Sequence, residues 1–336
     1  MRKSGQLFVA LIAITLVWFV SASSVSAQNP MTPVNPPMPS QRFDNDKETL
    51  YGQFSANKRG VSPEQRERAY LAAREFLRKY GGDDDTYTKE AKNFITDYER
   101  ETKQYEVYTA YSAKNFEKTF ERGRALLKNE PENFFVLSVL SEAGYENAQA
   151  GKATFNDETV DYLRRAIQLV ETGKVSKVDP FKSVAAADGF LHLALGWFLK
   201  DKAPREAASA FVKAVQPQSP YETDALVYYR LGVAILKGEF AELTIEYNEK
   251  FGAQRESPEQ RAMFERIAKA GDRAIDAFAR SVALSDPKRP VGDTRITPEF
   301  RDKVVAQLTA LYKSLHQNSD AGLSELVAGV LSKPLP

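Results

Sequence analysis

Helical periodicity is the feature that most limits the fold of this 336-residue chain. From Ser62 onward apolar residues recur at helical spacing, and sustained period-two alternation, the signal of a half-buried strand, is absent. The pattern predicts an all-α protein of about 12–13 helices. The expected spans are 63–80, 86–112, 115–129, 132–150, 156–172, 181–200, 204–216, 221–237, 239–251, 258–270, 272–284, 297–317 and 320–332.

Helix starts account for the most conspicuous short motif. Ser62-Pro63-Glu64-Gln65-Arg66 recurs as Ser257-Pro258-Glu259-Gln260-Arg261, and Thr297-Pro298-Glu299 is similar. Ser or Thr caps a helix, Pro suits its first position, and Gln three residues after Ser can bond back to it. The acidic run from Asp83 to Asp85 lacks the alternating ligand spacing of a calcium loop and is interpreted as another helix start.

A spacing of small, large and small residues recurs in the middle of the chain. It reads small-x3-large-x2-small, and its clearest examples are Ala207/Phe211/Ala214, Ala274/Phe278/Ser281 and Thr159/Leu163/Ala166. A second pattern, aromatic-x2-Leu-Gly, occurs at Tyr228, Leu231 and Gly232, and Lys237 to Phe240 is expected to turn the chain into the next helix. Small residues admit a neighbouring helix while the large residue fills the gap.

These patterns resemble the tetratricopeptide repeat family, which stacks helix pairs about every 34 residues. Phe116 and Pro131 supply the clearest single unit, although Gly123 stands where that unit should carry a bulky residue and therefore predicts a close helix approach or a packing gap. The resemblance implies a right-handed α-solenoid of antiparallel helix pairs. We assign residues 110–287 to the array, 46–109 to divergent N-terminal helices and 288–336 to a C-terminal cap.

The N-terminal segment has the three parts of a secretory signal. Arg2 and Lys3 precede an apolar run from Leu7 to Val20, and small residues end at Ala27. We expect cleavage after Ala27; retention as an anchor is the alternative. Residues 28–45 are rich in Pro and Asn and should form a disordered linker. This organisation predicts a bacterial periplasmic or secreted protein with no membrane span in the mature chain.

Composition excludes several classes of function. The absence of cysteine rules out disulfides, thiol nucleophiles and thiolate metal sites. The 46 basic and 45 acidic residues include Arg2 and Lys3 of the signal, so the mature charge is 44 − 45, or −1. A net charge this close to zero produces no positive electrostatic field that would attract nucleic acid.

No catalytic constellation stands out, so neither an enzyme activity nor a cofactor or metal is predicted. Of the two histidines, His192 lies in an apolar helix and is expected in the core, and His316 lies near a helix end. Nucleophile-elbow and nucleotide-binding motifs are absent. A catalytic pair of carboxylates is still an alternative, because the acidic residues are too numerous for the sequence to single out two of them.

A binding surface is therefore the leading hypothesis. In the family that the chain resembles, the first helices of the pairs line a concave face, and this maps onto Phe135, Ser138, Glu142, Tyr145, His192 and Tyr229. We expect a non-catalytic scaffold that binds a protein or peptide in the cell envelope, in an oligomeric state that the sequence does not define. The alternative is an all-helical glycan- or ligand-binding periplasmic protein, and the two differ in whether a peptide or a glycan stabilises the fold.

Overall fold

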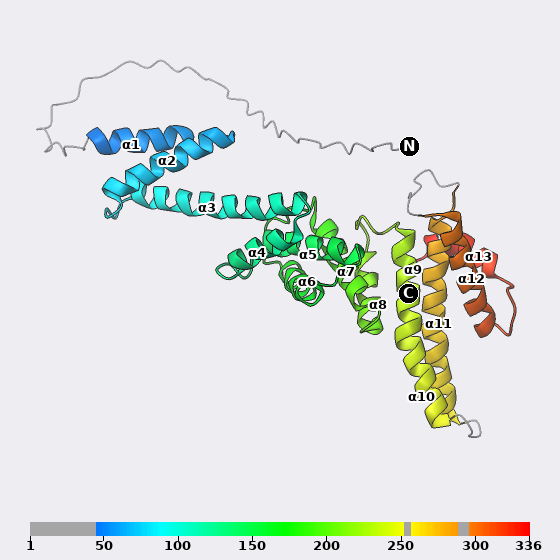
Figure 1. The fold of residues 1–336 in the computed structure, drawn as a ribbon. Coiled ribbons are helices and arrows are strands. Elements are labelled where there is room, and N and C mark those ends of the chain that lie inside the picture. The colour runs from blue at the N-terminus through cyan, green and yellow to red at the C-terminus, as the bar shows by residue number, and fades with distance from the viewer. Residues whose placement is uncertain (1–44, 252–256, 288–295) are drawn as a thin grey trace, which may run out of the picture. The chain divides into compact units, whose positions relative to one another are not determined.

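The computed structural model describes residues 45–251, 257–287 and 296–336, and every regular element in these ranges is helical (Figure 1). The prediction of an all-α fold is confirmed. The α-helices are α1 (Asn45–Asn57), α2 (Pro63–Tyr80), α3 (Thr86–Ser112), α4 (Phe116–Leu127), α5 (Phe134–Gln149), α6 (Asn156–Glu171), α7 (Val184–Leu199), α8 (Pro204–Ala214), α9 (Ala225–Ile235), α10 (Ala241–Phe251), α11 (Pro258–Leu284), α12 (Pro298–Leu315) and α13 (Leu323–Gly329). A π-helical segment, η1 (Leu236–Phe240), joins α9 to α10, and a 3-10 turn, η2 (Val330–Ser332), follows α13.

Part of the predicted organisation lies outside the described residues. The signal peptide, nearly all of the linker and the first residues of the C-terminal cap fall in 1–44 and 288–295. In the ranges that the structure describes, no helix combines the length and apolar character that a membrane crossing requires.

Side-chain caps set the helix starts, as the sequence predicts. Ser62 accepts a hydrogen bond from the Gln65 backbone and Gln65 bonds back, which forms a complete capping box on α2. Ser257 and Thr297 also cap their helices, α11 and α12, by accepting a hydrogen bond from the backbone N–H three residues later. Neither forms the return bond of a complete capping box. Asp85 caps α3 by accepting from Thr88, which confirms that the acidic run is a helix start.

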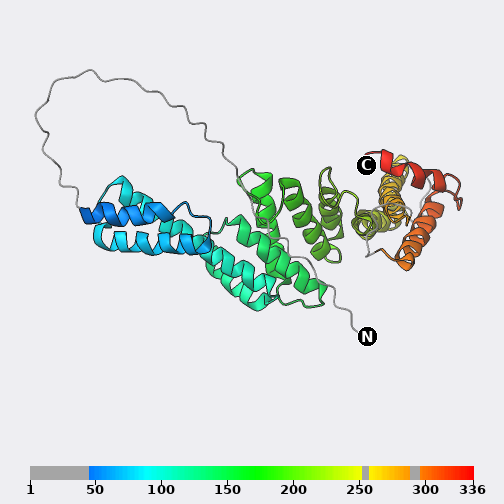
Figure 2. The same ribbon diagram turned by 90° about the horizontal axis from the view of Figure 1, so that it is seen from above.

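Neighbouring helices pack against one another in chain order from α2 to α9, then α9 against α11 and α11 against α12 (Figures 1 and 2). Some alternate helices are also in contact: α3 touches α5, and α5 touches α7. The arrangement is consistent with a helical repeat array. Its largest apolar core runs from Phe120 in α4 to Val330 in η2.

Close glycine contacts recur between helices of this core. A Cβ on Gly196 in α7 would lie 2.8 Å from the Phe211 ring of α8, and one on Gly232 in α9 would lie 2.7 Å from the Phe278 ring of α11. Both phenylalanines are fully buried. The recurring spacing therefore corresponds to a recurring contact, in which a glycine makes room for an aromatic ring of the facing helix.

The other repeat residues also lie at helix contacts or turns. Gly123 is buried, and a Cβ there would lie 2.7 Å from the Leu140 side chain of α5, which confirms the predicted close approach. Phe116 begins α4 and is half-buried against the main core, and Pro131 lies in the turn before α5. Buried residues of the repeat spacing are Ala166, Ala207, Ala214, Tyr228 and Leu231.

Two predictions around α9 to α11 are wrong. Residues 237–240 do not turn the chain into an antiparallel helix: η1 continues α9 into α10 with a kink at Gly238, whose φ/ψ of −94° and −105° are not helical. Residues 258–284 form one helix, α11, rather than two. Gly271 does not end it because this glycine is buried against Leu315 and Phe240, and the apolar pattern continues on both sides. Consequently α9 pairs with α11, and α10 with the first half of α11 forms a helical hairpin (Figure 1).

Helix α1 was not among the expected spans. Its sequence, NDKETLYGQFSAN, has almost no amphipathic periodicity, yet Phe54 is fully buried with Ala69, Ala73 and Phe76 of α2 and Ala91 of α3. Tertiary packing therefore stabilises a helix for which local sequence gives little signal.

Candidate functional site

The odd-numbered helices α3, α5, α7 and α9 share a surface that we call the odd-helix face. We define it by the side chains of Tyr111, Glu142, Tyr145, Trp197 and Arg230. α3 contacts α5 and α5 contacts α7 directly. Arg230 Nη1 of α9 lies 3.4 Å from the Tyr145 hydroxyl of α5 as a hydrogen-bond donor, across 85 residues of sequence. Side chains from helices far apart in sequence thus meet on one surface.

Aromatic rings form the centre of this face. The Tyr145 ring packs edge-on against Phe190 and Trp197 of α7, with centroids 5.8 and 5.6 Å apart. Trp197 remains partly exposed, and Lys200 Nζ lies 4.0 Å from its ring centroid. Aromatic residues that keep one face accessible supply contact area at low entropic cost, which is typical of recognition surfaces.

A carboxyl pair lies beside this centre. Glu142 and Glu146 stand one turn apart on α5. The Tyr111 hydroxyl of α3 donates to Glu146 Oε1 at 2.8 Å, and Lys114 forms an ion pair with Glu146. Burial and then the nearby Glu146 charge raise the pKa of Glu142 to about 7. Burial likewise raises the pKa of Tyr111. The pair contains one carboxylate with partners and one carboxyl that titrates near neutrality.

Exposed tyrosines continue the face along α3. Tyr105 is 69% exposed and Tyr108 is 41% exposed, and the Tyr108 ring centroid lies 6.3 Å from that of Phe135 in α5. Both rings are accessible to a partner, and Tyr108 is the one that contacts α5.

The six residues predicted to contact a partner divide by burial. Ser138, Tyr145 and His192 are buried, whereas Phe135, Glu142 and Tyr229 are half-buried. Phe135, Ser138, Glu142 and Tyr145 share α5. Tyr229 packs elsewhere, against Phe278 of α11 and Phe300 of α12. The partner-contacting role of these residues stays a prediction.

His192 is a core histidine, as expected, and its Nδ1 is within hydrogen-bond distance of Asp188. Its Nδ1 lies 3.0 Å from the Asp188 carbonyl and 3.1 Å from the Asp188 carboxylate, and its Nε2 lies 3.8 Å from Glu171. The other histidine, His316, caps the end of α12 and stacks on Tyr312 with ring centroids 3.9 Å apart.

Sequence reasoning missed five contributors to the odd-helix face: Tyr108, Tyr111, Glu146, Trp197 and Arg230. A signal existed for the two tyrosines, because Tyr105, Tyr108 and Tyr111 recur at threefold spacing on a predicted helix. Nothing local marks Arg230, since its partner Tyr145 lies four helices earlier, on α5.

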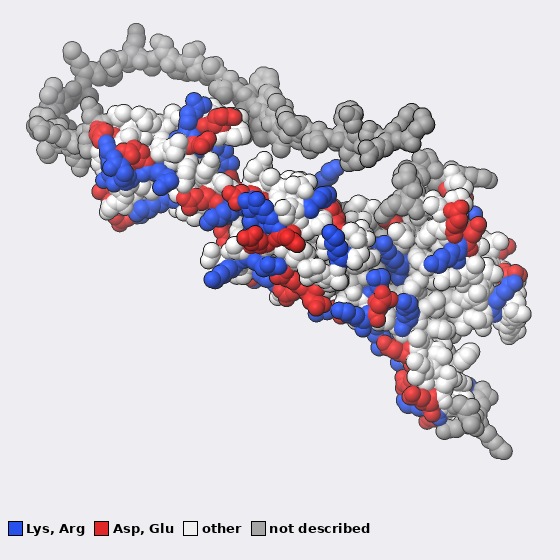
Figure 3. Space-filling view, in the orientation of Figure 1, with Lys and Arg blue, Asp and Glu red and all other residues white. Residues whose placement is uncertain are grey.

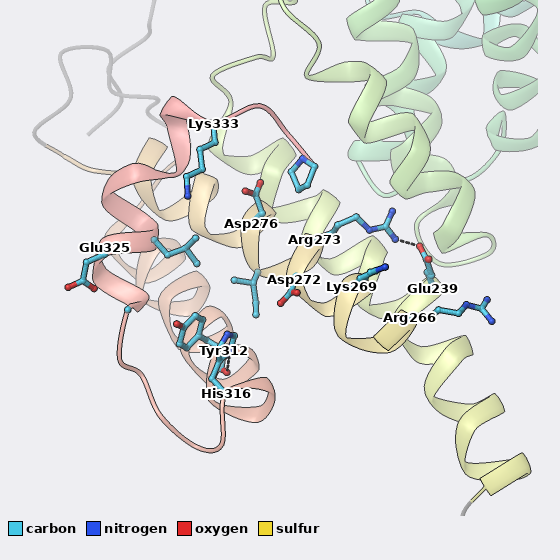
Figure 4. A pocket seen from close by; sticks show the side chains of 14 residues that line it. Glu239, Arg266, Lys269, Asp272, Arg273, Asp276, Tyr312, His316, Glu325 and Lys333 are labelled. Carbon is cyan, nitrogen blue, oxygen red and sulfur yellow. Dashed lines mark hydrogen bonds and ion pairs between the residues drawn. The ribbon is translucent and has the colours of Figure 1, made fainter. Parts of the chain in front are cut away.

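A separate pocket of about 950 Å³ lies between α11, α12 and α13 (Figure 4). Ile275, Tyr312 and Leu326 form its apolar part. Its charged residues are Glu239, Arg266, Lys269, Asp272, Arg273, Asp276, Glu325 and Lys333. Both signs are present, so the pocket has no single charge preference.

Ion pairs fix part of this pocket. Arg273 pairs with Glu239. Arg280, only 6% exposed, pairs with Asp276 at 2.6 Å and donates to the backbone carbonyls of Lys333 and Pro334 at 2.8 Å each. Burial raises the pKa of Asp276. Arg280 therefore ties the segment after η2 to α11 and helps to shape one wall.

Elsewhere the surface has mixed charge. On the face shown in Figure 3, Lys and Arg side chains are interspersed with Asp and Glu side chains. In the ranges that the structure describes, no group of three or more His, Asp or Glu side chains is placed to hold a metal ion.

Comparison with known proteins gives no relative. No protein-family model, curated protein or solved structure matches this chain. What the chain does is therefore argued from its own residues, and the class that the fold defines is an all-helical protein with sequential helix-pair packing.

Proposed function

We propose that this protein is a non-catalytic, tetratricopeptide-like right-handed α-solenoid that binds an extended peptide or a protein segment along the odd-helix face. The repeated glycine–phenylalanine contacts at Gly196 and Gly232 support the repeat architecture. The predicted signal supports export, and hence a partner in the bacterial cell envelope.

The observation that carries the proposal is the composition of the odd-helix face. This face carries the accessible Tyr105 and Tyr108 on α3, the half-buried Phe135 and the carboxyl of Glu142 on α5, and the half-buried Trp197 on α7. An extended ligand crossing several helices could contact aromatic and charged groups in turn. Mixed charge over the molecule argues against nucleic acid as the partner.

Binding is favoured over catalysis because the carboxyl pair described on this face, Glu142 and Glu146, lies one helical turn apart on a single helix, α5. Glu146 is occupied by Tyr111 and Lys114. Glycosidase carboxyls instead face one another across a substrate.

Selection from a random peptide library on the purified mature protein tests this function. Selected peptides should lose at least tenfold in affinity when Tyr105 and Tyr108 become Ala, as expected for aromatic contact residues at an interface. Phe264→Ala is the matched control, because Phe264 is an exposed aromatic residue on α11 away from this face. Absence of any selected peptide, or equal losses in the control, would refute the proposal.

The pocket of Figure 4 favours a second candidate, small-ligand binding. Its size is in the range of ordinary ligand sites, and it joins an apolar wall to charged groups. A compound or glycan panel that raises the melting temperature of the protein, but not of a Leu326→Trp variant, would support it. Leu71→Trp, on exposed α2 surface, is the control.

A further inference from the structure

We propose that Glu142 and Glu146 receive a basic side chain, the guanidinium or ammonium group of an Arg or Lys, from the peptide that binds the odd-helix face. This inference rests on the proposed function and adds to it the chemistry of one required ligand group. Three observations carry it: the partners of the two carboxyls, a buried hydroxyl next to them, and the aromatic flank.

The two carboxyls differ in what they contact. Glu146 accepts from the Tyr111 hydroxyl and pairs with Lys114. Glu142 is half-buried one turn away on the same face of α5 and forms no ion pair with any described Lys or Arg, although the Tyr111 hydroxyl and the Lys114 charge both act to lower its pKa. Glu142 has a pKa of about 7 and is therefore about half charged at neutral pH, whereas Glu146 already has the Lys114 ammonium as its partner. A cation supplied from outside would favour the charged form of Glu142.

A buried hydroxyl without a partner lies under this pair. Ser138 is fully buried, and its Oγ has no hydrogen-bond partner within the described residues. It precedes Glu142 by one helical turn. Helical side chains lean toward the N-terminus of their helix, so the Glu142 side chain extends over Ser138. Buried polar atoms are ordinarily hydrogen-bonded, so Ser138 adds unmet hydrogen-bonding capacity one turn from Glu142.

Aromatic rings flank the carboxyls on the solvent side. Tyr108 remains 41% exposed and lies against Phe135, one turn before Ser138 on α5. A guanidinium stacks on such faces while its N–H groups bond carboxylates. A neutral glycan could also stack there, but it would supply no counter-charge to Glu142. The missing ion-pair partner therefore favours a cation.

Occupation by a cation should release a proton. The titratable groups acting on Glu142 are Tyr111 from α3, Lys114 from the turn after α3, and Glu146 from its own helix; α4, α6 and α7, which also pack on α5, add none within the described residues. Glu142, with a pKa near 7, is about half protonated at that pH. A cation beside it lowers its pKa, so binding at pH 7 should release up to about half a proton.

The experiment uses the library-selected peptides and, for each, a version with every Arg replaced by citrulline and every Lys by norleucine. Isothermal titration measures Kd at pH 7 in two buffers that differ in ionisation enthalpy. We expect the neutral version to bind roughly tenfold to a hundredfold more weakly, the range expected for loss of a charge-assisted contact. Glu142→Gln should reduce affinity similarly and abolish the buffer dependence. Glu249→Gln, on exposed α10 surface, should change neither.

Failure of this inference is distinct from failure of the proposed function. Peptides that need Tyr105 and Tyr108, yet bind equally well without basic residues and to Glu142→Gln, would overturn the inference and leave the function standing. If no peptide binds and a glycan raises the melting temperature instead, both are overturned. Because Gln keeps the size of Glu and removes only its charge, the variant is expected to fold, which circular dichroism checks.

Discussion

Glu142→Gln should make the free protein more stable at neutral and alkaline pH. In the folded chain the pKa of Glu142 is raised from 4.5 to about 7, so the folded state holds a proton that the unfolded state loses. Stability from this group is therefore greatest at low pH and declines as pH rises from about 4.5 to about 7. At about 1.4 kcal/mol for each tenfold change in proton affinity, the decline amounts to at most about 3 kcal/mol.

Urea unfolding at a series of pH values from 5 to 8.5 measures this effect. Gln carries no charge, so the variant escapes the decline and its advantage over the wild type should grow with pH, reaching about 1–3 kcal/mol above pH 7.5. The Glu249→Gln control should run parallel to the wild type, because Glu249 is exposed on α10.

The result that would refute this reasoning is a constant difference between variant and wild type across the pH series. A wild type that gains stability relative to Glu142→Gln as pH rises would mean that Glu142 has a lowered pKa and a cationic partner in the free protein. The inference of an unneutralised carboxyl would then fail as well.

Two further predictions concern packing and a buried ion pair. Gly232→Ala should destabilise the protein by about 1–3 kcal/mol in thermal or urea unfolding, because its Cβ would meet the buried Phe278 ring at 2.7 Å. Gly52→Ala, with open space around it, should be neutral or slightly stabilising. Arg280→Met should cost about 3–5 kcal/mol, since it leaves the half-buried Asp276 unpaired, and should speed proteolysis near Lys333. Adding Asp276→Asn should recover part of this loss, and no recovery would contradict the role of the pair.

Helix ends were predictable wherever a local cap determines them. The spans 63–80 and 86–112 agree with α2 and α3, because Ser62 and Asp85 bond within three residues of themselves. Helix α1 was not predictable in this way, since its stability comes from Phe54 packing against α2 and α3. Capping side chains close in sequence determine where a helix begins. A helix with weak amphipathic periodicity, such as α1, depends instead on tertiary contacts that the sequence does not show.

The candidate site shows the same division. Phe135, Ser138, Glu142 and Tyr145 could be grouped from their spacing on one helix. The neighbours of these residues could not be predicted from spacing, because Arg230 contacts Tyr145 only after α5, α7 and α9 have packed together. Helix α3 crosses the predicted boundary at residue 110, so Tyr108 and Tyr111, which both lie beside α5, fell in different predicted segments.

The helical hairpin of α10 and the first half of α11 has the properties of an insertion within one repeat. α9 packs on the second half of α11 through the Gly232–Phe278 contact, as α7 packs on α8 through Gly196–Phe211. The hairpin has a small apolar cluster of its own, which contains Leu243, Met263 and Ile267 and is separate from the main core. Two helices that pack together, α9 and the second half of α11, are therefore separated in sequence by a hairpin that has its own apolar cluster.

Deletion of residues 241–268 tests this view. Phe240 lies against Gly271, and Glu239 pairs with Arg273, so the two cut ends are close enough for a short Gly-Ser linker to join them. The shortened chain should keep its helical circular dichroism and one cooperative unfolding transition, because the Gly232–Phe278 contact and the main core remain. Removal of α7 and α8, which contribute many residues to that core, should abolish the transition. If the hairpin deletion also abolished it, the hairpin would be part of the cooperative core rather than an insertion, and the pairing of α9 with α11 would not suffice to complete the unit.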